Sequence, residues 1–236
     1  MPAIHTIRLG FTNTYLIEAE GGFVAVDAGS LRREKAFAWA MGRLGLAFDR
    51  VRLIVATHVH YDHVGSLSAI RNLCRCPAAV HRSEAPALAS GRMAAVPAGT
   101  NPYGRFVSAV GTRVASRGWL DFPPVRADIL VDGHYPLADF GLDGRLVLTR
   151  GHTAGSISLI LNSGQAFIGD VAVNYLPFGL GPIMPPFADN TGRLFETWRE
   201  LGEAGIRTLY PAHGLPFSIY ELLAQRERRL GLVGLD

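Results

Sequence analysis

The chain has little of what a secreted or membrane protein needs. Among its 236 residues are only two cysteines, and Cys74 and Cys76 are too close in sequence to close a useful disulfide loop. We expect both to be buried free thiols. No run approaches the roughly 18 apolar residues of a membrane span, and the start, Met-Pro-Ala-Ile-His, lacks a basic segment followed by an apolar one. These absences predict a soluble, cytoplasmic protein with no membrane partner.

Lysine is nearly absent, because Lys35 is the only one and arginine supplies the rest of the basic charge. The net charge is +3, and the arginines are spread along the chain. Proteins that bind nucleic acid usually concentrate basic residues in a patch. The sequence therefore predicts no nucleic-acid partner. Hydrophobic residues make up 48% of the chain and charged residues 18%, which is ample for one large core.

The apolar pattern predicts a single α/β domain over residues 1–236. We expect strands at 4–9, 14–19, 23–26, 51–56, 78–81, 129–131, 145–149, 156–161, 165–168 and 208–210. Helices are expected at 31–44, 65–73, from Ser83 with Glu84 in the first turn, 191–201 and 218–229. Residues 91–126 are broken by glycines and prolines and carry five arginines against one acid. We interpret them as a partly helical insertion.

Three histidines and an aspartate follow directly on the strand expected at 51–56. Alternation along an extended segment places His58 and His60 on one side and Val59 on the other, so two imidazoles can converge on one ion. Asp62 and His63 follow where the chain turns into a helix, and they can face a second position. A purely structural role would bury these polar groups without gain. The string Thr57-His-Val-His-Tyr-Asp-His63 therefore predicts metal binding.

Three further candidate ligands stand in the same setting. His152, Asp170 and His213 each follow a predicted strand, at 145–149, 165–168 and 208–210. The carboxyl ends of such strands gather at one edge of a sheet, where open α/β folds place their sites. Imidazole and carboxylate ligands suit zinc first, and also iron or manganese. The other histidines, His5, His81 and His134, are expected to be structural.

These motifs resemble the signature of the metallo-β-lactamase superfamily over essentially the whole chain. The resemblance rests on Thr-His58-Val-His60-Tyr-Asp62-His63, Gly-His152-Thr, Gly-Asp170, His213-Gly and Val-Asp27-Ala-Gly. It implies an αββα sandwich, in which two mixed sheets pack face to face with helices outside. It also implies that His58, His60 and His152 hold one metal, that Asp62, His63 and His213 hold the other, and that Asp170 bridges them. Asp27 would accept a ring N–H from a ligand histidine, although it or Ser30 could instead cap the helix that follows.

The activity implied is metal-dependent hydrolysis. A water between two divalent ions loses its proton near neutral pH, and the hydroxide attacks an ester, lactone or thioester carbonyl while Asp62 or Asp170 relays a proton. Tyr175 is a candidate donor to the oxyanion, although related lactonases carry their tyrosine nearer the bridging aspartate, where this chain has Val173. The apolar segment 175–188 is predicted to be a lid, with a role in covering the core as the alternative.

Absences narrow the choice within the family. Asp170 and the lack of a signal peptide disfavour a true β-lactamase, and a single helix after His213 cannot form the glutathione-binding domain of the glyoxalase II type. No glutathione-binding arginine motif or flavodoxin domain is found. A small-molecule hydrolase is expected, with a mononuclear iron oxygenase of thiols or persulfides, a phosphodiesterase, or a non-catalytic metal-binding or ligand-sensing module as alternatives. The substrate and the oligomeric state, a homodimer included, stay open.

Overall fold

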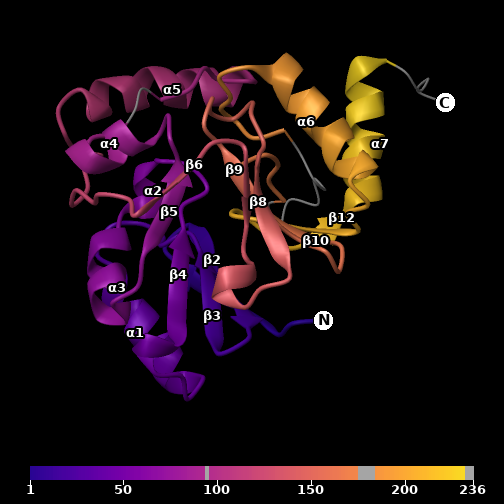
Figure 1. Cartoon of the computed structure of the whole chain (residues 1–236). Helices are drawn as coiled ribbons and strands as arrows, with labels where there is room; N and C mark the ends of the chain where they lie inside the picture. The colour runs from indigo at the N-terminus through magenta and orange to yellow at the C-terminus, as the bar shows by residue number, and fades with distance from the viewer. Residues whose placement is uncertain (94–95, 175–183, 232–236) are drawn as a thin grey trace.

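The computed structural model describes residues 1–93, 96–174 and 184–231. They form two six-stranded β-sheets with helices on their outer faces (Figure 1). The first sheet has the order β1-β2-β3-β4-β5-β6. Its strands are β1 (Ile4–Leu9), β2 (Thr12–Ala19), β3 (Gly22–Val26), β4 (Val51–Val55), β5 (Ala78–His81) and β6 (Ile129–Val131). The first three strands are antiparallel, and β3 to β6 are parallel, so this sheet is mixed.

The second sheet has the order β12-β11-β10-β9-β8-β7. Its strands are β7 (His134–Pro136), β8 (Gly144–Leu148), β9 (Ile157–Leu161), β10 (Gln165–Gly169), β11 (Thr208–Pro211) and β12 (Phe217–Ser218). Only β10 and β11 are parallel neighbours. Because β9 is antiparallel to both β8 and β10, the strands β8, β10 and β11 all run in the same direction. Their carboxyl ends therefore lie at one edge of the sheet.

The helices connect and cover the sheets. The α-helices are α1 (Glu34–Arg43), α2 (Tyr61–Val64), α3 (Leu67–Cys74), α4 (Ala85–Ser90), α5 (Pro102–Ala115), α6 (Thr191–Glu203) and α7 (Ile219–Leu230), and the 3-10 turns are η1 (Phe48–Arg50) and η2 (Ala138–Phe140). Of these, α5 lies inside the expected insertion. It begins where the Asn101 side chain accepts the Gly104 N–H at 2.7 Å, with Pro102 at the first helical position, a combination that favours helix initiation.

Alternation along the strands builds three apolar layers and so fixes the sandwich. On β2, Leu16 packs toward Phe37 and Met41 of α1 in the layer outside the first sheet. Its neighbour Ile17 points to the opposite face, where the two sheets meet. On β10, Phe167 belongs to this central layer, whereas Ile168 packs in the layer beneath α6 and α7. The expectation of an αββα sandwich is therefore confirmed, since each sheet buries both faces.

The structure corrects several predicted boundaries. The helix expected at 31–44 begins only at Glu34, and neither Asp27 nor Ser30 caps it, because its N-cap position is Arg33 without a side-chain bond. The helix expected at 65–73 is α3, which begins at Leu67, and the short helix α2, which was not expected, precedes it. The chain breaks between them where Ser66 Oγ donates to Ser30 O at 2.6 Å and accepts the Arg33 N–H at 2.7 Å. The short strands β7 and β12 were not expected, because runs of three and two residues show no apolar period.

The described residues test two expectations that came from the composition. Cys74 and Cys76 are free and buried, as predicted, and both pack in the layer beneath α1 and α3. No helix among the described residues is long and apolar enough to cross a membrane.

Candidate metal centre

Every candidate ligand that sequence reasoning selected lies at one edge of the sandwich. His58 follows β4 of the first sheet, and His152, Asp170 and His213 follow β8, β10 and β11 of the second. Two backbone hydrogen bonds join the sheets at this edge, from Ile157 N to Thr57 O and from Asn13 N to Ala212 O, each 2.8 Å. The strand ends of both sheets therefore deliver side chains to a common region, as doubly layered α/β folds do at their sites.

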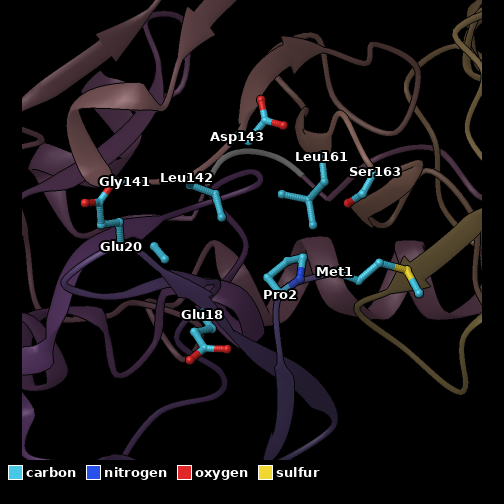
Figure 2. Close-up of a pocket in the computed structure, with 10 residues that line it drawn as sticks. Met1, Pro2, Glu18, Glu20, Gly141, Leu142, Asp143, Leu161 and Ser163 are labelled. Carbon is cyan, nitrogen blue, oxygen red and sulfur yellow. The ribbon is translucent and has the colours of Figure 1, made fainter.

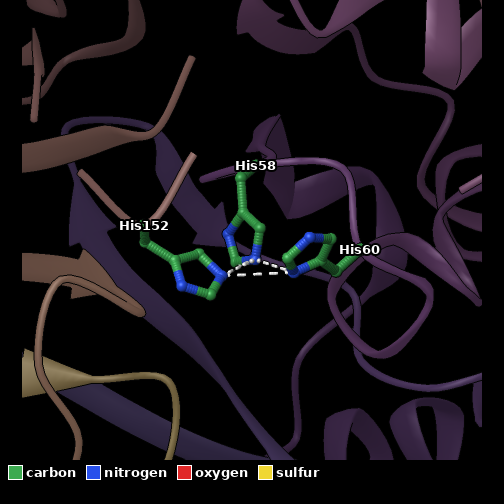
Figure 3. Close-up of side chains that lie close together, drawn as sticks. All are labelled: His58, His60 and His152. Atoms are coloured by element: carbon green, nitrogen blue, oxygen red, sulfur yellow. Dashed lines mark hydrogen bonds between the residues drawn. The ribbon is translucent and has the colours of Figure 1, made fainter. Parts of the chain in front are cut away.

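Three imidazoles converge on one point (Figure 3). His58 Nε2 lies 2.9 Å from His60 Nδ1 and 3.1 Å from His152 Nε2, and His60 Nδ1 lies 3.2 Å from His152 Nε2. For comparison, ligand nitrogens about 2.0–2.1 Å from a tetrahedral zinc ion stand about 3.3 Å apart. Burial lowers the pKa of all three histidines, well below the ordinary value for His58 and His60. The rings are therefore neutral and offer lone pairs.

Asp62, His63 and His213 form a second group beside the first. Their ligand atoms lie within 4.8 Å of one another. His213 Nε2 is 3.4 Å from Asp62 Oδ2, and His63 Nε2 is 4.0 Å from the same oxygen. Helix α2 places Asp62 and His63 here because the chain turns immediately after His60, whose backbone is still extended.

Asp170 lies between the two groups, with one carboxylate oxygen toward each. Its Oδ1 is 3.5 Å from His63 Nε2 and 3.3 Å from His213 Nε2, whereas its Oδ2 is 3.6 Å from His152 Nε2. Burial alone would raise the pKa of Asp170, but the neighbouring charges of His213 and His63 hold it well below its usual range. The side chain is therefore an ionised carboxylate in the orientation that a bridging ligand requires.

Gly169 allows Asp170 to reach this position. Its backbone has a φ of +52°, and a Cβ atom there would meet Thr57 Oγ1 at 2.6 Å. Gly214 does the same beside His213, because its φ is +100° and a Cβ would meet Asn174 O at 1.7 Å. Only glycine accommodates both the conformation and the contact, which explains why glycine flanks each of these two ligands.

Hydrogen bonds on the far side of each ring fix which nitrogen faces the centre. His152 Nδ1 lies 2.8 Å from Phe187 O, and His213 Nδ1 lies 2.9 Å from Phe11 O. Since a carbonyl only accepts, each Nδ1 must carry a proton, and Nε2 of His152 is left to coordinate. Sequence reasoning missed both carbonyls, because a main-chain oxygen leaves no signal in the residue type.

Asp27 and Thr57 orient His58 and His63. His63 Nδ1 donates to Asp27 Oδ2 at 2.9 Å, and the Thr57 backbone N–H donates to Asp27 Oδ1 at 2.8 Å. Thr57 Oγ1 lies 3.0 Å from both carboxylate oxygens and 3.1 Å from His58 Nδ1. The hydroxyl thus donates to Asp27 and accepts from His58, so one buried carboxylate sets the orientation of two histidines. Thr57 was not selected from the sequence, although it directly precedes His58.

The charge state of the second group shows what an ion would replace. Burial lowers the pKa of His213, but Asp170 more than compensates and raises it to about 9. Burial also lowers the pKa of His63, but Asp27 and Asp170 raise it well above its usual range. In the metal-free protein, protons on these two rings supply the positive charge that a metal ion would otherwise bring. His63 Nε2 and Asp170 Oδ1 are buried and have no hydrogen-bond partner within the described parts of the structure. Both facts fit a centre built for cations.

Two expectations near the site lie wholly or partly outside the described residues. Tyr175, the candidate oxyanion donor, is outside them, as is the expected lid over residues 175–183. The described end of that segment, residues 184–188, contains Met184 and Ala188, which are buried in the layer beneath α6. This end therefore packs on the core, which was the alternative to a lid, and the role of the earlier part stays a prediction.

Figure 2 shows a separate pocket, which has a volume of about 450 Å³. It is lined by Met1, Pro2, Glu18, Ala19, Glu20, Gly141, Leu142, Asp143, Leu161 and Ser163. Strand β2 runs from Thr12, whose hydroxyl lies 3.5 Å from Asp62 Oδ2, to Ala19 at this pocket. At about 3.3 Å per residue the pocket is about 23 Å from the metal centre. None of the residues that line it belongs to the ligand groups.

Comparison with known proteins agrees with the geometry. The sequence model of the metallo-beta-lactamase superfamily matches residues 7–213. The probable metallo-hydrolase YflN of Bacillus subtilis (strain 168) is 24% identical over 230 residues, covering 91% of this chain and 85% of that protein. The probable metallo-hydrolase MJ0888 of Methanocaldococcus jannaschii is 27% identical over 208 residues, covering 86% of this chain and 87% of its own length.

Solved structures show the same architecture. The archaeal superfamily protein ST1585 from Sulfolobus tokodaii aligns with a TM-score of 0.69 at 19% identity, over 100% of this chain and 89% of that one. The BLEG-1 B3 metallo-beta-lactamase aligns with a TM-score of 0.68 at 20% identity, over 94% of this chain and 97% of that one. Likeness at this level of identity supports the fold and says nothing of the substrate.

Proposed function

The chain belongs to the metallo-β-lactamase superfamily, and from that premise we propose that it is a hydrolase that uses two divalent metal ions to cleave a small ester, lactone or thioester. The observation that carries this proposal is the position of Asp170, whose two oxygens face the two ligand groups separately. A structural ion needs one closed set of ligands. Two adjacent groups that share a carboxylate are typical of binuclear hydrolytic centres.

In this proposal each ligand group holds one ion. His58, His60 and His152 would hold the first, and Asp62, His63 and His213 the second, with Asp170 shared. Zinc is the first candidate, since imidazole and carboxylate suit it, and iron and manganese are the alternatives. When bound, such ions lower the pKa of a water molecule and polarise a carbonyl oxygen.

The two carboxylates are the parts of the centre that face solvent. The side chains of Asp62 and Asp170 are 17% and 11% exposed, whereas those of the ligand histidines His63, His152 and His213 are 0%, 1% and 7% exposed. Substrate therefore approaches beside Asp62, the more exposed of the two. We assign to Asp62 the transfer of a proton from the attacking water to the leaving alcohol or thiol, as the C–O or C–S bond breaks. This chemistry requires no serine or cysteine nucleophile.

The test is a substrate panel with protein purified without chelators. Lactones, thioesters and aryl esters should be hydrolysed, and phosphodiesters should not. Asp170→Asn keeps the shape but removes the shared charge, so it should lower the activity by about 100-fold or more, at or beyond the upper end of the effects seen for groups around a metal. Asp128→Asn is the matched control, because Asp128 binds Arg71 and the Ala78 N–H at the amino end of β5, opposite the ligand edge.

Three results would contradict the proposal. Cleavage of phosphodiesters with no activity on any carbonyl substrate would replace it with a phosphodiesterase. One iron per chain together with oxygen uptake would favour the oxygenase. Full activity of Asp170→Asn would remove the shared role of that carboxylate.

A further inference from the structure

Glu84 is a buried carboxylate that belongs to neither ligand group. It stands at the N-cap position of α4, and it is 7% exposed. Its side chain leaves the helix and turns inward instead of capping it. Oε2 accepts the Val59 backbone N–H at 3.1 Å, and Oε1 accepts the Thr153 hydroxyl at 2.8 Å. Each oxygen therefore accepts a hydrogen bond from a different segment, and the two segments are distant in the sequence.

Those two segments carry the three-histidine group. Val59 lies between His58 and His60, and Thr153 directly follows His152. One segment extends from β4 of the first sheet and the other from β8 of the second. The Glu84 carboxylate thus joins the ligand loops of the two sheets.

The surroundings of Glu84 hold it in this position. Thr153 is fixed by Ser156, whose Oγ accepts the Thr153 N–H at 3.1 Å and lies 2.9 Å from Thr153 Oγ1. Gly155 leaves room for the carboxylate, because a Cβ atom there would meet Glu84 Cγ at 2.6 Å and Oε1 at 2.9 Å. A buried acid is retained only where its bonds are satisfied, and here the Val59 backbone N–H and the Thr153 hydroxyl both donate to one side chain.

We propose that Glu84 is a positioning residue that sets the distance between His152 and the pair His58 and His60, and so the affinity of the three-histidine group for its ion. The proposal rests on the proposed function only in that this group binds a metal. Removal of the carboxylate takes away the bonds to Val59 and Thr153, so the backbone bond from Ile157 N to Thr57 O holds the two segments together without them. The three nitrogens, now within 2.9 to 3.2 Å of one another, would then spread.

Affinity for Co²⁺ and Zn²⁺, measured by chelator competition, tests this assignment, together with the visible absorption spectrum of the Co²⁺ form. Glu84→Ala should weaken binding of the first ion by about 10–100-fold, the usual effect of losing a partner outside the ligand set. Its Co²⁺ spectrum should also change, because the ligand geometry relaxes. Glu84→Gln keeps an oxygen for the Val59 N–H, and its amide can donate to Thr153 Oγ1, so its affinity and spectrum should stay close to those of the unaltered protein.

Two further variants separate positioning from stability. Thr153→Val removes the bond to Glu84 Oε1 and should weaken metal binding less than Glu84→Ala does. If Glu84→Ala does not fold, Thr153→Val tests the proposal in its place. Ile70→Val removes a methyl group from the core at α3, away from the ligand loops, and should leave the metal affinity unchanged. Equal affinities and identical Co²⁺ spectra in all folded variants would overturn the proposal and leave the proposed function standing. Failure of the unaltered protein to bind any ion would refute the proposed function itself.

Discussion

Asp27→Asn tests whether one buried carboxylate sets the ligand tautomers. Asp27 has a φ of 60°, a conformation that asparagine tolerates well, so the backbone should not change. The new amide oxygen can still accept from the Thr57 N–H and hydroxyl, both of which now contact Oδ1. The new NH₂ would replace Oδ2, which lies 2.9 Å from His63 Nδ1.

The substitution therefore sets a donor against a donor. His63 can relieve the conflict by losing its Nδ1 proton and keeping the one on Nε2, the nitrogen that faces Asp62 and Asp170. An ion must then displace that proton. A hydrogen bond to a charged group contributes about 1.5–3 kcal/mol, which corresponds to about a 10–100-fold loss of affinity, in line with other partners of metal-binding histidines.

The assay is a chelator-competition titration that resolves the two binding events. The second ion should bind about 10–100-fold more weakly in Asp27→Asn, while the first should change less, because Thr57 can still accept from His58. Asp128→Asn, which also replaces an acceptor of a backbone N–H, is the control and should bind as the unaltered protein does. Unchanged affinity for both ions in Asp27→Asn would refute the assignment of Asp27.

Three more outcomes follow from the structure. Gly104→Ala should weaken metal binding, because a Cβ there would clash with Pro186 O and displace the neighbouring Phe187 carbonyl, which bonds to His152 Nδ1. Gly111→Ala on the same helix meets only a side chain at 3.3 Å and should not weaken it. In metal-free protein, burial lowers the pKa of His213 but Asp170 raises it to about 9. Stability from this group is full below about pH 6.5 and is lost as the pH rises through 9, so denaturation midpoints of the metal-free protein should fall over that window. Removal of the ions with a chelator should lower the melting temperature, and adding Zn²⁺ back should restore it in proportion to the logarithm of its concentration, as differential scanning fluorimetry can measure.

The sequence predicted those strands and ligands that residue type and spacing along the chain determine. Apolar runs at 14–19 and 165–168 predicted strands, and the structure has β2 and β10 there. The string from His58 to His63 predicted convergent imidazoles because short spacing after a strand leaves few other geometries. The distant partners His152, Asp170 and His213 could be placed only because each follows a strand, and parallel strands end at the same edge.

What the sequence could not show is what the backbone does. The carbonyls of Phe11 and Phe187 orient two ligand histidines, yet no residue type marks them. Glu84 was expected only as an acid in the first turn of a helix, because nothing local says that its side chain turns inward. The break between α2 and α3 depends on bonds from Ser66 to the distant Ser30 and Arg33. Such contacts arise from tertiary packing, which local patterns do not encode.

The most direct test of the central claim is the number of metal ions per chain in protein purified without chelators, measured by elemental analysis against protein concentration. The two ligand groups joined by Asp170 predict two ions per chain in the unaltered protein and fewer than two in Asp170→Asn. A single ion per chain in the unaltered protein, or two ions retained in Asp170→Asn, would contradict a binuclear centre that shares this carboxylate.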